Sequence, residues 1–175
     1  MTSELAQRRF LEVVLPHLDD AYALAKWLTG NATDAEDVVQ DACVRALRAL
    51  ETASVERPRP WTLAIVRNVA FTWLAKNRPK MLLVNVEDDA DTAAETVGTA
   101  APTPEEALIA AVDRDRLRAA IAALPHAFRE TLVMREINGL SYRDIAETVG
   151  VPVGTVMSRL ARARAILAGV LGRPE

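Results

Sequence analysis

Cysteine and aromatic residues are scarce in this 175-residue sequence, and long apolar runs are missing. A single cysteine, Cys43, excludes an intramolecular disulfide and is typical of a reducing cytoplasm. No apolar run approaches the roughly 20 residues of a membrane span, and the polar start MTSELAQRRFLEVV lacks the apolar region of a signal peptide. We therefore expect a soluble, cytoplasmic protein that does not insert into a membrane.

Signatures of catalysis are missing as well. The sequence contains no metal-ligand spacing, no phosphate-binding loop and no nucleophile–base set. Cys43 has no second cysteine, and neither His17 nor His126 forms a ligand pair with it in sequence. We expect no enzymatic activity, no metal and no cofactor, and we interpret Cys43 most simply as a buried thiol.

Helical patterns account for most of what is present. Half of the residues are hydrophobic, only 5% are aromatic, and no strand pattern occurs. Capping boxes at TDAE (33–36) and TPEE (103–106) and a serine cap at Ser141 mark three helix starts. The predicted helices cover 4–15, 17–28, 33–50, 61–78, 103–123, 125–139, 142–150 and 152 onward. The segment ETASVERPRP is predicted to be a loop, and the fold class is all-α.

Charge divides the chain into three parts. Residues 1–80 carry a net charge of +1, residues 81–112 carry −7 without any lysine or arginine, and residues 113–175 carry +3. The acidic middle is rich in alanine and threonine and has no sustained apolar period. We expect two small helical domains, 1–80 and 113–175, joined by a flexible acidic linker. An acidic loop inside one domain is the alternative.

The sequence LSYRDIAETVGVPVGTVMSRLARAR has the pattern of a helix-turn-helix. That motif needs a small residue where its helices cross, a residue that tolerates positive φ in the turn, and an apolar residue that fixes the second helix to the core. Ala146, Gly150 and Val156 meet these needs at workable spacing.

The last helix explains why an acidic chain has a basic segment, GVPVGTVMSRLARARA, with three arginines and no acid. At about 100° per residue, one stripe is apolar and expected in the core: Val156, Leu160, Ala163 and Leu167. A face about 120° away carries Thr155, Ser158, Arg159 and Arg162. These side chains suit the major groove, and Arg164, off both stripes, suits a phosphate. A solvated basic face is the alternative.

The third predicted helix has an outer face on which two apolar residues, Val44 and Leu47, lie among polar ones. The other residues of this face are Glu36, Asp37, Gln40, Asp41 and Arg48. Apolar residues ringed by acids favour a protein interface, and scattered surface aliphatics are the alternative.

The fourth predicted helix gathers an indole, an amide, a hydroxyl and an ammonium on one face. These belong to Trp61, Asn68, Thr72 and Lys76, with Ala75 among them. Such a face can stack and hydrogen-bond an unpaired base while binding backbone phosphate. Alternatively, Trp61 is the first core residue of the helix.

Three segments, in this order, resemble a bacterial sigma factor of the extracytoplasmic-function (ECF) group. DAEDVVQDACVRAL resembles the polymerase-binding part of region 2, and RPWTLAIVRNVAFTWLAKNRP resembles the part that melts and reads the minus-ten element. The segment from LPHAFRETL to RARAIL resembles region 4, which reads the minus-35 element. The chain departs from the usual pattern at Thr72, Ala75, Met157 and Ala161, which bear on the promoter that is read.

The resemblance implies a role for each face. It implies that Asp37, Gln40 and Asp41 bind the clamp helices of core RNA polymerase and that Asn68 contacts the non-template strand of promoter DNA. The predicted minus-35 set is Ser141, Thr155, Ser158, Arg159, Arg162 and Arg164. The resemblance also implies an anti-sigma factor as a partner. A sigma-like decoy and a stand-alone helix-turn-helix repressor are the other hypotheses.

Overall fold

Helices make up nearly all of the described chain. The computed structural model describes residues 2–79 and 104–172. The first half contains α1 (Thr2–Val13), the 3-10 helix η1 (Leu15–His17), α2 (Leu18–Thr29), α3 (Ala32–Ala49) and α4 (Pro58–Asn77). The second half contains α5 (Pro104–Ala122), α6 (His126–Glu136), α7 (Tyr142–Val149) and α8 (Val153–Leu171). No strand occurs among these described residues, and the all-α prediction is confirmed.

Helix α4 begins three residues before the predicted start, inside the segment expected to be a loop. Pro58 is its first residue and Pro60 follows in the same turn. Proline is tolerated there because the first N–H groups of a helix have no intrahelical acceptor and because its fixed φ suits the helix. The two prolines therefore start this helix and do not interrupt it.

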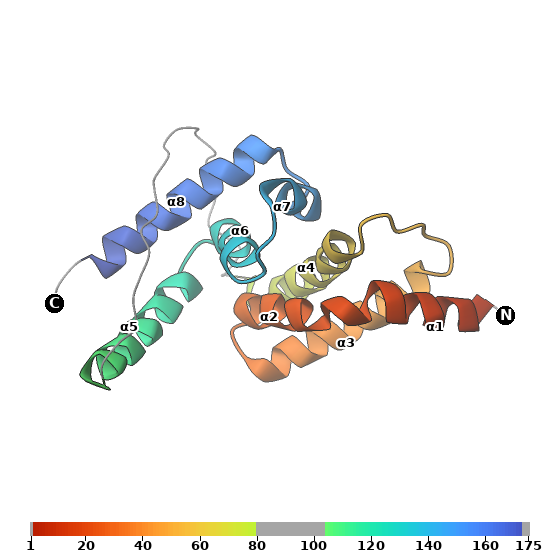
Figure 1. The fold of residues 1–175 in the computed structure, drawn as a ribbon, viewed down its shortest axis with the longest axis horizontal. Coiled ribbons are helices and arrows are strands. Elements are labelled where there is room, and N and C mark those ends of the chain that lie inside the picture. The colour runs from red at the N-terminus through yellow and green to blue at the C-terminus, as the bar shows by residue number, and fades with distance from the viewer. Residues whose placement is uncertain (1, 80–103, 173–175) are drawn as a thin grey trace.

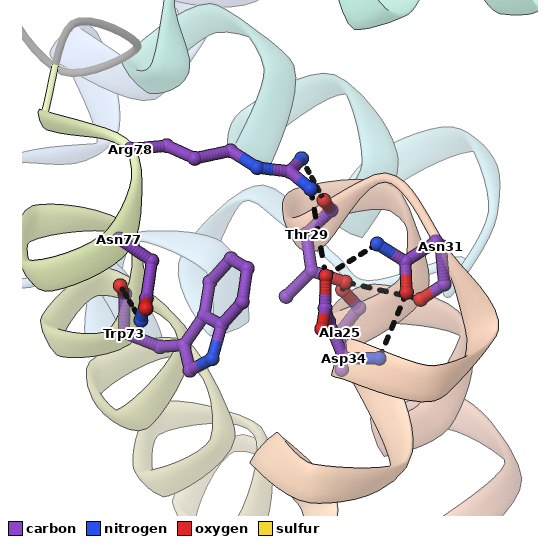
Figure 2. Close-up of polar contacts among 7 residues, drawn as sticks. All are labelled: Ala25, Thr29, Asn31, Asp34, Trp73, Asn77 and Arg78. Atoms are coloured by element: carbon purple, nitrogen blue, oxygen red, sulfur yellow. Dashed lines mark hydrogen bonds and ion pairs between the residues drawn. The ribbon is translucent and has the colours of Figure 1, made fainter.

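The junction of α2 and α3 differs from the predicted capping box at Thr33 (Figure 2). Gly30 ends α2 in the left-handed conformation, with φ of 89°. The Asn31 side chain then accepts a hydrogen bond from the Asp34 backbone N–H at 2.8 Å, and its amide donates to the Asp34 carboxylate. The predicted cap is wrong because Asn31 and Asp34 make the reciprocal pair two residues earlier, so that α3 begins at Ala32.

Helix α5 opens the second half of the chain at Pro104, as the proline in TPEE predicted. It includes residues 104–112, which the charge pattern had assigned to the acidic linker. The remainder of that predicted linker, residues 81–103, lies outside the described residues.

The two halves pack against each other (Figure 1). One connected cluster of buried side chains runs from Leu24 in α2 through Val66 in α4 to Leu132 in α6 and Leu160 in α8. Helix α2 contacts α6, and α4 contacts α7. The packing therefore fixes α4 and the helix-turn-helix relative to each other.

Candidate nucleic-acid and protein interfaces

Helices α7 and α8 form a helix-turn-helix. The Ser141 hydroxyl caps α7 by accepting a hydrogen bond from the Asp144 backbone N–H at 3.1 Å. Gly150 ends α7 with φ of 79°, a conformation that glycine adopts without steric strain. Ala146 is buried in α7, and Val156 is fully buried in α8. The motif predicted from these residues is confirmed.

The outer face of α8 carries the side chains predicted to read DNA. All four are half-buried: Thr155, Ser158, Arg159 and Arg162. The Ser158 hydroxyl donates to the Thr155 carbonyl at 3.0 Å, which orients it along the helix. The predicted core stripe of α8 is also in place, since Val156, Leu160 and Ala163 are buried and Leu167 packs against the cluster.

Arg164 has a partner within the protein. Its guanidinium donates to the Glu136 carboxylate of α6 at 2.8 Å. This hydrogen bond raises the pKa of Arg164 and links α8 to α6. A contact between Arg164 and a promoter phosphate stays a prediction, because such a contact would have to compete with Glu136.

The outer face of α3 is exposed as predicted, with Val44 at its centre. Val44 is 48% exposed, and Leu47 is half-buried beside it. The polar members of the face are all exposed: Glu36, Asp37, Gln40, Asp41 and Arg48. A groove of about 400 Å³ runs between this face and α1, lined by Gln7, Phe10, Leu11, Cys43, Val44 and Leu47. The contribution of α1 was not predicted, because it depends on helix packing.

The predicted nucleic-acid face of α4 is exposed except at its first member. Asn68, Thr72 and Lys76 are exposed, and the Thr72 hydroxyl donates to the Asn68 carbonyl at 3.0 Å. Trp61 is half-buried and packs against a small cluster formed by Val14, Ala46 and Leu50. Most of the Trp61 side chain is therefore covered, so that Trp61 is mainly a core residue, as the alternative held.

Arg78, which directly follows α4, anchors the carboxyl end of this helix to the junction of α2 and α3 (Figure 2). Arg78 donates to the Thr29 carbonyl at 2.7 Å and lies 3.5 Å from the Asp34 carboxylate. Its guanidinium also lies over the Trp73 ring, 5.5 Å from the centroid. These contacts fix the last turn of α4 against the α2–α3 junction.

A neighbouring face of α4 binds the second half of the chain, a role that the sequence did not predict. Arg67 donates two hydrogen bonds to the Glu130 carboxylate, at 2.7 and 3.0 Å. Arg57 donates to the carboxylates of both Asp144 and Glu147. The partners lie 63 to 90 positions apart, so no local pattern could have revealed them.

The Glu130 side chain is only 1% exposed. Its charge state matters because a buried carboxylate is costly unless neighbouring groups pair with it. Burial alone would raise the pKa of Glu130. The contact with His126 and the two hydrogen bonds from the Arg67 guanidinium outweigh burial and place the pKa of Glu130 below its ordinary value. Glu130 is therefore a carboxylate at neutral pH, held by Arg67 and by His126 at 3.4 Å.

Other chemical features of the described residues are few. Cys43 is half-buried, and burial raises the pKa of its thiol. Within residues 2–79 and 104–172, no group of three or more histidine, cysteine, aspartate or glutamate side chains has the arrangement of a metal site. The described helices also lack the combination of length and hydropathy that crossing a membrane requires.

Two known sequence families match the two halves. Residues 13–79 match the family described as Sigma-70 region 2, and residues 114–167 match Sigma-70, region 4. These matches cover the α3 and α4 faces and the helix-turn-helix, and they define a sigma-type transcription factor. We call residues 13–79 region 2 and residues 114–167 region 4.

Individual relatives narrow the class. The chain is 33% identical to the ECF RNA polymerase sigma factor SigE of Mycolicibacterium smegmatis over 93% of its own length and 61% of that protein. It is 34% identical to the RNA polymerase sigma-H factor of Pseudomonas aeruginosa, over 90% of this chain and 83% of the relative. The chain belongs to the ECF RNA polymerase sigma factors, which direct promoter-specific initiation of transcription.

The fold agrees with a solved structure. The sigma factor RpoE of Bartonella quintana, solved with the anti-sigma factor NepR, matches with a TM-score of 0.68 at 24% identity. The match covers 96% of this chain and 99% of the other.

Proposed function

We propose that the outer faces of α3, α4 and α8 divide the work of a sigma factor. In this assignment α3 binds core RNA polymerase, α4 reads the minus-ten element and α8 reads the minus-35 element. The observation that carries the proposal is that the members of these faces, apart from Trp61, lie outside the buried core, and that each face contains chemistry suited to a partner. The domain boundaries predicted from charge, 1–80 and 113–175, are part of this proposal.

Core polymerase would bind the acidic rim of α3 and the groove beside it. Exposed Val44 and half-buried Leu47 offer apolar area, and Asp37 and Asp41 offer charges around it. An apolar centre with a polar rim is the usual anatomy of a protein interface. Phe10 and Leu11 of α1 extend the apolar area beyond what α3 supplies alone.

The minus-ten element would be read as a single strand by α4. Asn68 supplies an amide for a base edge, and Thr72 and Lys76 lie one and two turns further along the same exposed face. Lys76 suits a phosphate, because its ammonium is a compact charge on a flexible stem. Trp61 would stack a base only with the part of its ring that the core leaves exposed.

The minus-35 element would be read in the major groove by the amino-terminal half of α8. Arg159 and Arg162 suit guanine edges, and Thr155 and Ser158 suit shorter hydrogen bonds. Ser141, at the start of α7, is placed for a backbone phosphate contact of the kind that helix amino termini make.

Control by an anti-sigma factor in the cytoplasm completes the proposal. The fold-level likeness to a sigma factor solved with the anti-sigma factor NepR supports it. The apolar groove beside α3 gives such a partner a surface that it would share with polymerase.

Run-off transcription with purified core polymerase tests this proposal. A genomic library of promoter fragments is transcribed by core enzyme with and without the protein. We expect transcripts that depend on the protein and start downstream of one shared pair of elements. A decoy would give no transcripts, and a repressor would lower transcription by a holoenzyme that already contains another sigma factor.

A further inference from the structure

Region 4 is docked on the face of α4 that adjoins the predicted DNA-reading face. Arg67 immediately precedes Asn68, and its guanidinium lies 3.3 Å from the Asn68 side-chain oxygen. The same guanidinium binds Glu130 of region 4 through two hydrogen bonds. The residue that ties region 4 to α4 therefore contacts the residue assigned to read a base.

A second group of ion pairs joins region 4 to the amino terminus of α4. Arg57 binds two carboxylates of α7, Asp144 and Glu147. The Thr148 hydroxyl of α7 lies 3.5 Å from the Pro60 carbonyl of α4. Two arginines of region 2 are thus occupied by three carboxylates of region 4, one on α6 and two on α7.

These contacts have the chemistry of phosphate binding. A guanidinium presents its N–H groups as a planar fork that fits carboxylate and phosphate oxygens in the same bidentate way. Arg67 binds both oxygens of Glu130 in that manner. Because Arg67 lies next to Asn68, a phosphate of a strand whose base contacts Asn68 would lie within reach of Arg67.

The docked arrangement is too small to span a promoter. The minus-ten and minus-35 elements lie about 25 base pairs apart, which is about 85 Å at roughly 3.4 Å per step. A compact chain of this length has a radius of gyration of about 16 Å, hence a diameter of roughly 40 Å. Reading both elements on one straight duplex therefore requires region 4 to leave α4, and leaving exposes Arg57 and Arg67.

We propose that Glu130, Asp144 and Glu147 of region 4 occupy, in the free protein, the arginines Arg57 and Arg67 that bind promoter phosphates once the regions separate. The carboxylates act as an internal substitute for the DNA backbone. This inference rests on the assignment of α4 to the minus-ten element. The inference adds two phosphate-binding residues to the minus-ten site. It also means that the docking of region 4 on α4 inhibits DNA binding at that site.

Variants on the two sides of one contact test the proposal. The double variant D144N/E147Q and the single variant R57Q both remove the ion pairs between α7 and Arg57. Only R57Q also removes the proposed phosphate contact. R118Q is the matched control, because Arg118 is an exposed arginine whose partner Asp115 lies within α5.

Separation of the regions is measured in the free protein by energy transfer between dyes. The dyes are attached at T33C in α3 and G169C in α8, both exposed positions, in a C43A background. We expect D144N/E147Q and R57Q to lower transfer to a similar extent and R118Q to leave it unchanged. Unchanged transfer in both test variants would overturn the inhibitory contact.

Promoter binding is then measured with holoenzyme over a range of salt concentrations. We expect R57Q to weaken binding and lower the slope of log affinity against log salt by about one, whereas D144N/E147Q binds at least as tightly as the wild type. Equal effects of the two variants would mean that Arg57 only holds region 4, which would overturn its DNA role.

A third comparison separates this inference from the proposed function. If wild-type holoenzyme does not bind the promoter at all, the assignment of α4 fails. If wild-type holoenzyme binds but R57Q and D144N/E147Q behave like R118Q, the assignment stands and the substitution of carboxylates for phosphates fails.

Discussion

Among single residues, Glu130 is a buried charge that joins region 4 to region 2. Its carboxylate is almost fully buried and bound by Arg67 and His126. Removing one partner of a buried ion pair leaves an uncompensated charge, which costs about 3–5 kcal/mol. We expect Glu130→Gln to lower the free energy of unfolding at pH 7 by about that amount, as measured by urea denaturation.

The pH dependence of this effect has a definite sign. The pKa of Glu130 is lowered in the folded protein, so its stabilising contribution is present above the ordinary carboxyl pKa of about 4.3 and is lost as the pH falls through the lowered value. The difference in unfolding free energy between wild type and Glu130→Gln should therefore shrink only in acid. A difference that stays constant from pH 7 to pH 3 would contradict this account.

The reactivity of the Cys43 thiol can be used to probe the groove between α1 and α3, which Cys43 lines. Burial raises the pKa of its thiol, so little thiolate is present at pH 7, and alkylation by iodoacetamide should be slow in the folded protein and fast in urea. Core polymerase should slow it further, because Cys43 lines the groove assigned to that partner. Mass spectrometry measures the rate, and equal rates in free protein and holoenzyme would place the polymerase interface elsewhere.

At the scale of helices, α3 offers a clean test of its outer face. Val44→Asp should reduce holoenzyme formation at least 10-fold, because it puts a charge into apolar contact area, while leaving the helical circular dichroism unchanged. Leu5→Asp on α1 is the matched control, since Leu5 is 58% exposed and does not line the groove. Retention of Val44→Asp by immobilised core enzyme at the level of Leu5→Asp would show that this face is only solvated.

Helix α8 makes a sequence-specific prediction. Arg159→Ala should weaken binding of holoenzyme to a promoter with the cognate upstream element by about 1–3 kcal/mol, the usual magnitude of a bidentate base contact. The same variant should bind almost normally when that element is scrambled. Competition binding with the two promoters measures both, and an equal loss on both would show that Arg159 contacts phosphate and no base.

The helices differ in how far the sequence predicted them. The two stripes of α8 follow from spacing within one helix, so Val156 and Leu160 were placed correctly. The start of α3 was missed because the TDAE pattern at Thr33 resembled a capping box as closely as Asn31 and Asp34 did. The contacts of Arg57 and Arg67 were beyond prediction, because they join distant segments that meet only when the two regions pack.

At the scale of the whole molecule, charge and packing both argue against independent DNA binding. The chain carries a net charge of −3, so its long-range field attracts DNA weakly. Region 4 is docked on α4 through buried apolar contacts and ion pairs, and the docked form is too short for both elements. Core polymerase would stabilise the separated arrangement at promoter spacing and so remove the cost of opening from DNA binding.

Titration of fluorescent promoter DNA, followed by anisotropy at physiological salt, tests this central claim most directly. The free protein should bind with a dissociation constant in the micromolar range or weaker, and core polymerase should convert this to binding that is tight and specific for the promoter sequence. Nanomolar, sequence-specific binding by the protein alone would contradict the account, because it would show that the chain recognises its site without polymerase.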